Sequence, residues 1–261
     1  MVKAVPVLTY HHVNPRPGDM VTVTPEHFAA QMAFLQRSGY RTLFLDELLD
    51  WMAGKKALNE KALVLTFDDG YLDNYRYAYP ILKKFGLKAT IFLVTGWSGR
   101  EREAVDRQRI FTHQECRELQ EAGRPERMAL TWPEARQLEG EGLVRIESHT
   151  HEHTKNLFAD VEALRESLRL SQESFQQHLG KKSTCLCWPG GRYNAASLEA
   201  AREFGFTACC TTERGLNIPG GDPWRLKRIT VEDTGAGWLR KTLFVFSRPG
   251  LGNLYARLKP R

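Results

Sequence analysis

The chain has 261 residues, of which 42% are hydrophobic and 26% are charged, and its formal net charge is +6. This length and composition allow one large α/β domain with an ordinary core and argue against disorder of the chain as a whole. The positive charge would suit an anionic partner, but zinc-finger spacing, basic-region helices and RNA-binding aromatic signatures are absent from the sequence, which argues against nucleic acid.

The first half of the chain alternates between predicted strands and helices. A strand at 4–10 is followed by a helix that begins with the cap Thr24 and Pro25 and closes at Gly39. The next predicted elements are a strand at 41–44, a helix at 45–52, a buried strand at 62–67, a helix at 74–85 and a buried strand at 88–94.

The second half repeats the alternation. Its predicted elements are a helix at 132–141, a strand at 143–147, a helix at 160–179, a strand at 184–188, a helix at 195–204 and a strand at 206–211. Such β-α alternation predicts one α/β domain over 1–261, with a parallel sheet closed or nearly closed into a barrel.

Two segments fit this alternation poorly. The charged stretch at about 96–131 is predicted to be an inserted loop with one helix, near the mouth of a site. The basic segment at about 239–261 is predicted to be either a final barrel helix with a solvated basic face or a tail that lies on an anionic bilayer.

Cysteine usage and the first residues bear on location. The five cysteines are odd in number and form no C-x-x-C pair, which favours reduced thiols over a disulfide framework. The opening MVKAVPVLTY lacks the features of a signal peptide, and the sequence contains no 18-residue uncharged apolar run. We expect a cytoplasmic protein, peripheral at the inner membrane if it contacts lipid; a secreted or periplasmic location applies if a leader has been removed.

Two adjacent carboxylates, Asp68 and Asp69, follow the buried strand at 62–67 directly, in the sequence T-F-D-D-G. Carboxylates at the end of an apolar strand are costly unless something pairs with them, and a divalent metal would do so. The alternative is a polar turn in which Gly70 supplies a positive φ.

Three histidines lie in S-H-T-H-E-H at 148–153, after another strand. His149 and His153 are four residues apart, so one helical turn would place both rings on the same side, with His151 pointing away. Two imidazoles and one carboxylate form a familiar catalytic metal site with open positions for water.

A third motif, W-P-G-G-R-Y at 188–193, also follows a strand. Its glycines would let backbone N–H groups approach a substrate, and the N–H of Gly190 is our candidate donor to an oxyanion. The alternative is an ordinary strand-to-helix turn.

In this order, T-F-D-D-G, S-H-T-x-x-H and W-P-G-G resemble the polysaccharide deacetylase family of metal-dependent carbohydrate esterases, over about residues 5–231. The opening L-T-Y-H-H-V at 8–13 resembles the subgroup that acts on exopolysaccharides such as poly-N-acetylglucosamine. The resemblance implies a distorted (β/α)7-type barrel of parallel strands with outer helices. It also implies hydrolysis of N-acetyl groups on an amino-sugar oligo- or polysaccharide, free or lipid-linked.

The same resemblance implies roles for four residues. Asp69, His149 and His153 would bind one divalent metal ion, and Asp68 would be the general base. Zinc is the usual metal of the family, and related sites accept cobalt, nickel or iron.

The sequence departs from the family pattern in two places. The third motif usually begins with an arginine that orients the base, but that position holds Cys187; Arg228 is our replacement, and Arg192 a weaker one. The usual late L-x-H, which supplies the catalytic acid, is absent because no histidine follows His178. His11 is our candidate acid, and the alternative is a histidine exposed on the surface.

Two other functions remain open at this point. One is removal of a formyl or acetyl group from a lipid-linked sugar at the inner membrane face. The other, of a different class, is a catalytically inactive carbohydrate-binding module on the same fold.

Overall fold

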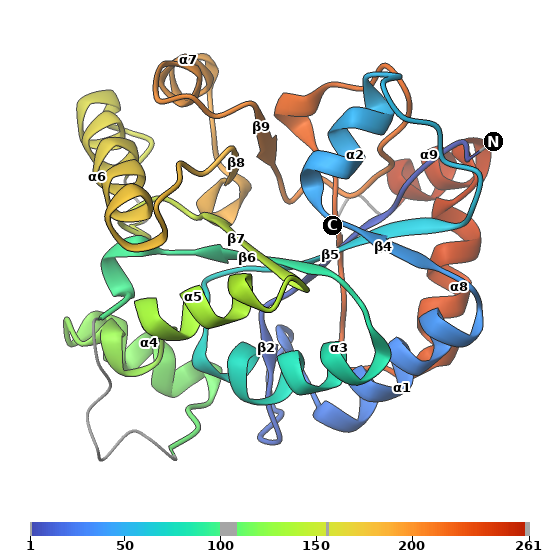
Figure 1. The fold of residues 1–261 in the computed structure, drawn as a ribbon, viewed down its shortest axis with the longest axis horizontal. Helices are drawn as coiled ribbons and strands as arrows, with labels where there is room; N and C mark the ends of the chain where they lie inside the picture. The colour runs from blue at the N-terminus through green and yellow to red at the C-terminus, as the bar shows by residue number, and fades with distance from the viewer. Residues whose placement is uncertain (1, 100–108, 155–156, 259–261) are drawn as a thin grey trace.

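A parallel sheet forms the centre of the molecule, and helices surround it (Figure 1). The computed structural model describes residues 2–99, 109–154 and 157–258. Within these ranges the sheet has eight strands in the order β10-β1-β5-β6-β7-β8-β9, with β4 paired to β5 beside β6. Every pair in this sheet is parallel, as expected for a distorted (β/α)7-type barrel.

The strands are short and follow the predicted positions closely. They are β1 (Val7–Tyr10), β4 (Arg41–Leu43), β5 (Ala62–Phe67), β6 (Ala89–Leu93), β7 (Val144–Ser148), β8 (Cys185–Cys187), β9 (Ala208–Cys210) and β10 (Ile229–Thr230). A separate two-stranded sheet, β2 (His12–Val13) with β3 (Thr22–Val23), was not expected from the sequence.

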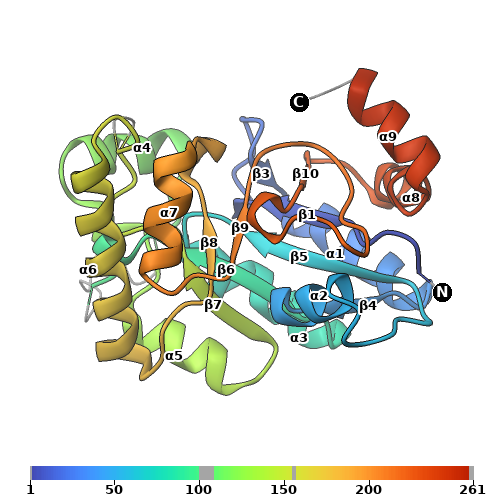
Figure 2. The ribbon, with the colours of Figure 1, turned by 90° about the horizontal axis from the view of Figure 1, so that it is seen from above.

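Most of the α-helices pack on the outside of the sheet, but the buried side chains of the helix Leu45–Met52 pack with Val7, Val64 and Phe92 on its inner side. The α-helices are α1 (Pro25–Arg37), α2 (Leu45–Met52), α3 (Tyr79–Phe85), α4 (His113–Glu121), α5 (Trp132–Gly140), α6 (Val161–Leu179), α7 (Ala195–Glu203), α8 (Ala236–Phe246) and α9 (Pro249–Leu258). Figure 2 shows α6 and α7 on one side of the molecule and α8 with α9 at the opposite side. The predicted helix at 74–85 is one π-helical turn, Asn74–Ala78, that leads into α3.

One short segment closes the ring of strands. Leu226 forms a parallel bridge with Cys210 at the end of β9, and three residues later β10 pairs with β1. The segment 226–230 therefore joins both edges of the sheet, and it carries Arg228 into the middle of the closure.

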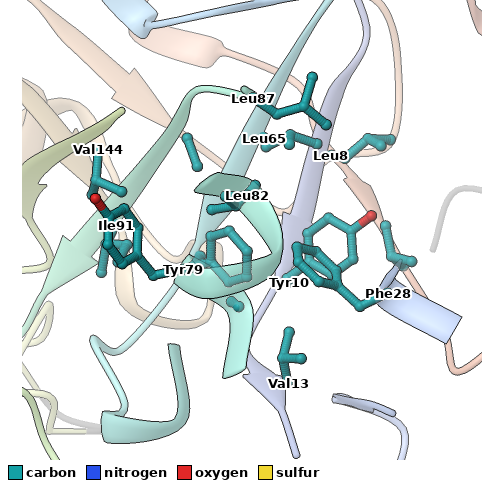
Figure 3. Packing of buried hydrophobic residues seen from close by; sticks show 14 of the residues in the cluster. Leu8, Tyr10, Val13, Phe28, Leu65, Tyr79, Leu82, Leu87, Ile91 and Val144 are labelled. Atoms are coloured by element: carbon teal, nitrogen blue, oxygen red, sulfur yellow. The ribbon is translucent and has the colours of Figure 1, made fainter. Parts of the chain in front are cut away.

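Alternation along the strands divides the core into two layers. Val64 belongs to an inner cluster with Phe92 and Cys187, whereas Leu65 belongs to an outer cluster beneath the helices. Figure 3 shows this outer packing, where Tyr79 and Leu82 of α3 lie over the strands near Tyr10 and Phe28. The strand pattern thus buries both faces, which explains the continuous apolar sequence of β5.

The segment at about 96–131 is more than a loop. It contains α4 as predicted, and its buried Phe111, Cys116 and Met128 pack with Tyr71 and Trp97 in a small core of their own. The part of this predicted loop at 100–108 lies outside the described residues. The insertion therefore packs onto the chain directly after β5 and β6.

The basic segment at about 239–261 is not simply a tail. Helix α8 buries Leu239, Leu243 and Phe246 in the outer core, so this part belongs to the barrel. None of the helices in the described ranges is both long and apolar enough to cross a membrane. The five cysteines all lie within those ranges, unpaired and buried.

Candidate active site

The polar residues named from the sequence gather at one edge of the barrel. Asp68 and Asp69 follow β5, His149 follows β7, and His11 follows β1. Since all the strands are parallel, their carboxyl ends meet at the same edge, which is where barrel enzymes place their chemistry. The topology therefore brings together segments separated by more than 130 residues.

The predicted metal ligands converge in the structure. Asp69 Oδ1 lies 3.3 Å from His149 Nε2 and 3.5 Å from His153 Nε2, and the three ligand atoms form one of the two groups close enough to hold an ion among the described residues. Asp69 and His149 are buried, while the His153 side chain is 29% exposed. One side of the cluster thus remains open to solvent and substrate.

The turn that presents the two histidines is not helical, so the prediction of a helical turn is wrong. Residues 149–153 have no helical assignment, and Thr150 has a φ of 68°. The reason is tertiary: the hydroxyl of Ser167 on α6 accepts hydrogen bonds from the N–H groups of His151 and Glu152. The loop is shaped by α6 and still directs both rings toward Asp69.

Backbone strain is concentrated at this cluster. Within the described ranges, Asp69 and Thr150 are the non-glycine residues with positive φ, at 70° and 68°. Left-handed backbone costs a non-glycine residue about 1–2 kcal/mol. The chain accepts this cost at two loops that carry the predicted ligands, a pattern typical of functional sites.

Gly70 is required by both conformation and space. Its φ is 67°, and an added Cβ would lie 2.3 Å from Leu93 Cδ1 and 3.3 Å from Leu93 Cα. We expect Gly70→Ala to lower the free energy of unfolding by about 2–5 kcal/mol, the sum of left-handed strain and overpacking. Gly86→Ala is the control, since Gly86 has a φ of 64° but open space around it, and should cost only the strain. Urea unfolding of both variants measures the difference, and equal losses would contradict the steric argument.

His149 is oriented by a second contact. Its Nδ1 lies 2.7 Å from the carbonyl oxygen of Cys187. A carbonyl only accepts, so Nδ1 carries the proton and the Nε2 lone pair is turned toward Asp69. This is the tautomer that a metal ligand needs.

Asp68 is held by a buried bidentate ion pair. Arg228 Nη1 and Nη2 donate to its two carboxylate oxygens at 2.7 and 2.8 Å, and Arg228 Nε donates to the Thr211 carbonyl at 2.8 Å. Burial raises the pKa of Asp68, but the guanidinium more than offsets this, so the pKa lies below its usual value. The carboxylate is therefore ionised and fixed in orientation at neutral pH.

Arg228 occupies the position beside Asp68 at which the family pattern would place the arginine of the third motif. Cys187 Sγ lies 3.1 Å from Arg228 Nη2 and 3.6 Å from Asp68 Oδ2. The short thiol leaves room for a guanidinium that arrives from the closing segment of the barrel. Arg192, the weaker candidate, is exposed.

We expect Arg228→Lys to lower kcat/KM roughly 10–100-fold, because a lysine cannot hold both oxygens of Asp68. Loss of one contact also raises the pKa of Asp68 toward its usual value, so the acidic limb of the pH profile should move to higher pH. Metal content should be unchanged. Arg225→Lys is the control, since Arg225 is exposed and paired with Glu213. If the pH profile of Arg228→Lys matched that of the wild type, the proposal that Arg228 orients Asp68 would be wrong.

A second group of potential ligands, Asp68 with His149 and Cys187, also lies within reach of one ion. Two observations favour the Asp69 group. Both oxygens of Asp68 are already engaged by Arg228, and burial raises the pKa of the Cys187 thiol well above its usual value, which disfavours the thiolate that binds metal.

His11 lies beside the base. Its Nε2 is 3.9 Å from Asp68 Oδ2, and its side chain is 23% exposed, so it is a residue of the site edge and not of the open surface. Burial lowers the pKa of His11 against the opposing effect of Asp68 and Asp69. Its buried Nδ1 has no partner among the described residues.

Gly190 and His151 are the two remaining residues of the predicted motifs. Gly190 is exposed in a single 3-10 turn, Pro189–Gly191, directly after β8, with a φ of 61°. His151 Nδ1 lies 3.0 Å from the hydroxyl of Thr95, and the ring is outside the predicted ligand set.

Sequence reasoning missed an aromatic wall beside the predicted ligands. Burial and nearby Asp69 raise the pKa of the Tyr71 hydroxyl, and the Tyr71 ring stacks on His12 with centroids 3.8 Å apart. His12 Nδ1 is in turn 2.6 Å from Asp73 Oδ2, and the Trp97 ring lies 5.5 Å from that of His153. The position of Tyr71 directly after D-D-G was the one available signal.

Comparison with known proteins agrees with this geometry. A Bacillus subtilis protein named as a candidate polysaccharide deacetylase is 29% identical over 232 residues, covering 89% of this chain and 73% of its own length. The Escherichia coli poly-beta-1,6-N-acetyl-D-glucosamine N-deacetylase is 26% identical over 229 residues, covering 80% of this chain but only 34% of its own length. A Streptococcus pyogenes deacetylase solved with acetate shares the fold, with a TM-score of 0.76, 24% identity and coverage of 93% and 99% of the two chains.

The sequence profile of one family matches residues 55–209, more than half of the chain, and its description is polysaccharide deacetylase. The matched range runs from the strand before the acidic pair to the end of the third motif and the strand beyond it. The family and the barrel expected from the sequence are both confirmed, and the chain belongs to the polysaccharide deacetylase family.

Proposed function

We propose that the protein is a metal-dependent hydrolase that removes N-acetyl groups from a glycan built on N-acetylglucosamine. The observation that carries this proposal is the convergence of Asp69, His149 and His153 beside an ionised, arginine-held Asp68. One oxygen and two imidazole nitrogens suit zinc and several other divalent ions, so the metal is not fixed by the donors.

The donor set fits a resident ion in three respects. The three ligand atoms lie close together, with Asp69 Oδ1 3.3 and 3.5 Å from the two Nε2 atoms. His149 has the required tautomer, and the exposed side of His153 leaves room for water and substrate. A divalent ion bound there would polarise the acyl carbonyl and bring the pKa of a coordinated water toward neutrality.

The chain's own residues supply the proton transfers. Asp68 is ionised and held by Arg228, so it accepts the proton of the attacking water. The backbone N–H of Gly190 is our candidate donor to the oxyanion that develops on the substrate. His11 is our candidate for the group that protonates the departing amine. Burial lowers the pKa of His11, and the negative charges of Asp68 and Asp69 oppose this effect.

The substrate class rests on relatives. The Escherichia coli relative is named for poly-beta-1,6-N-acetyl-D-glucosamine, and matches a span that includes most of this chain. We therefore place such a polymer first among substrates. A lipid-linked acetamido or formamido sugar is the second candidate, and an inactive carbohydrate-binding module is the third.

Metal removal and reconstitution tests the proposal. Purified protein is stripped with a chelator, reloaded with zinc, cobalt, nickel or iron, and incubated with β-1,6-linked and other N-acetylglucosamine oligomers, peptidoglycan fragments and lipid-linked sugars. Acetate release should disappear on stripping and return on reloading. Formate release would instead indicate a deformylase. If the protein bound a saccharide but released neither acetate nor formate with any of the metals, the inactive carbohydrate-binding module would be the remaining candidate.

A further inference from the structure

One face of the molecule exposes apolar side chains that the barrel does not need. Seven large hydrophobic side chains are exposed among the described residues, and four of them lie on the last two helices. These four are Phe244, Leu251, Leu254 and Leu258, which are 55%, 45%, 58% and 72% exposed. Single exposed apolar residues are ordinary, but such a concentration marks an interaction surface.

Helix α9 has two apolar sides. Gly252 packs toward the protein, where an added Cβ would meet Leu216 at 2.8 Å, and Tyr255 makes an edge contact with Phe246 of α8. Leu251, Leu254 and Leu258 recur at helical spacing and are exposed, so they form a stripe directed away from this packing. Figure 2 shows α9 projecting from one corner of the molecule beside α8.

The charge of this region has one sign. From Ala236 to Arg261 the sequence contains six basic residues and no aspartate or glutamate. Arg240 and Lys241 are exposed on α8, and the Arg248 guanidinium carbon lies 3.8 Å over the ring of Phe244. Exposed phenylalanine and leucine with flanking cations are typical of helices that lie in the headgroup region of an anionic bilayer.

We propose that this exposed face of α8 and α9 docks onto an anionic phospholipid bilayer. The charge argues against the other occupants. If a second copy of the chain bound to the same face, the basic residues of the two copies would lie close together. The segment contains no acidic residue to pair with them, so their repulsion disfavours a self-complementary contact. The inference goes beyond the proposed hydrolase activity and does not depend on it.

The docking face and the active site lie at opposite edges of the barrel. The inner side of α9 touches Leu216, whose neighbour Asn217 pairs with Val5 at the start of β1. Asp68 and Asp69 lie where the strands end. Strands of five or six residues rise about 15–20 Å, so roughly this distance separates the two edges of the sheet. This favours a long glycan over a sugar attached directly to a lipid headgroup.

Vesicle sedimentation of the full chain tests the docking. Deleting the segment is unsuitable because Leu239, Leu243 and Phe246 belong to the core. The apolar test variant is Phe244→Ser with Leu251→Ser and Leu254→Ser, and its control is Met20→Ser with Val161→Ser, two exposed apolar residues on other elements. The charge test variant is Arg240→Gln with Lys241→Gln, and its control is Lys55→Gln with Lys56→Gln.

We expect the wild type to bind vesicles that contain phosphatidylglycerol at low salt. It should bind these vesicles only weakly at high salt, and vesicles of pure phosphatidylcholine only weakly at any salt concentration. Each test variant should lower partitioning onto the vesicles at least about tenfold. For the charge variant the reason is that each cation near the surface contributes about fivefold. The controls should bind like the wild type. Circular dichroism confirms that the variants are folded. No binding to anionic vesicles at low salt, or unchanged binding by both test variants, overturns the proposal. A dimer in light scattering that the apolar variant abolishes, without vesicle binding, assigns the face to self-association instead.

Discussion

His149→Ala is expected to lower affinity for the divalent ion at least about 100-fold and to abolish turnover. Loss of a contact that merely orients a ligand already costs about 10–100-fold in affinity or activity, and this change removes a ligand itself. After this change His153 Nε2, 3.5 Å from Asp69 Oδ1, would be the one imidazole of the predicted ligand set left beside that carboxylate.

His151→Ala is the matched control for this change. It removes a histidine from the same loop, but one that contacts Thr95 and lies outside the predicted ligand set. Metal content by emission spectroscopy and affinity by competition with a chromogenic chelator measure both variants. Equal metal loss in the two variants would show that the loop, and not the ligand, was at fault.

Asp68→Asn is expected to lower kcat about 10²–10⁴-fold while metal stays bound, because the amide cannot accept the proton of the attacking water. It also leaves the buried Arg228 without a carboxylate, and breaking a buried pair costs about 3–5 kcal/mol. Activity should therefore be assayed well below the melting temperature of the variant.

Two readouts separate chemistry from stability in this variant. The absorption spectrum of the cobalt-loaded protein should be retained, because the three proposed ligands are intact. Asp46→Asn, at an exposed position on α2, is the control for the substitution itself. Normal deacetylation by Asp68→Asn would show that Asp68 is not the base.

Local sequence signals were sufficient for most elements. Helix α2 and strand β5 begin and end at the predicted residues, because α2 has apolar residues at helical spacing and β5 is continuously apolar. The capping side chain of Thr24 also begins α1 as predicted, and α6 ends at the predicted residue 179, directly before the left-handed Gly180.

Long-range pairing was harder to predict. The two residues of β10 join the sheet only because the segment 226–230 meets both β9 and β1, and β2 pairs with β3 across a loop. The turn at 149–153 was wrong for the same reason, since its shape depends on Ser167 of a later helix. Arg228 was named from its place in the following strand, and the structure pairs it with Asp68; its orienting role stays a prediction.

The roles of individual side chains remain predictions. The structure brings Asp69, His149 and His153 together and sets Arg228 against Asp68, but His11 and Gly190 are assigned by position alone. The aromatic wall of Tyr71 and Trp97 had no periodic signature, because each residue belongs to a different turn that packs only in the folded chain.

The most direct test of the site is anomalous diffraction from a zinc-loaded crystal, recorded above and below the zinc edge. We expect one strong peak within about 2.0–2.2 Å of a carboxylate oxygen of Asp69 and of Nε2 of His149 and His153. A peak on Asp68 and Cys187, or full zinc occupancy elsewhere with none at this cluster, would contradict the proposed centre.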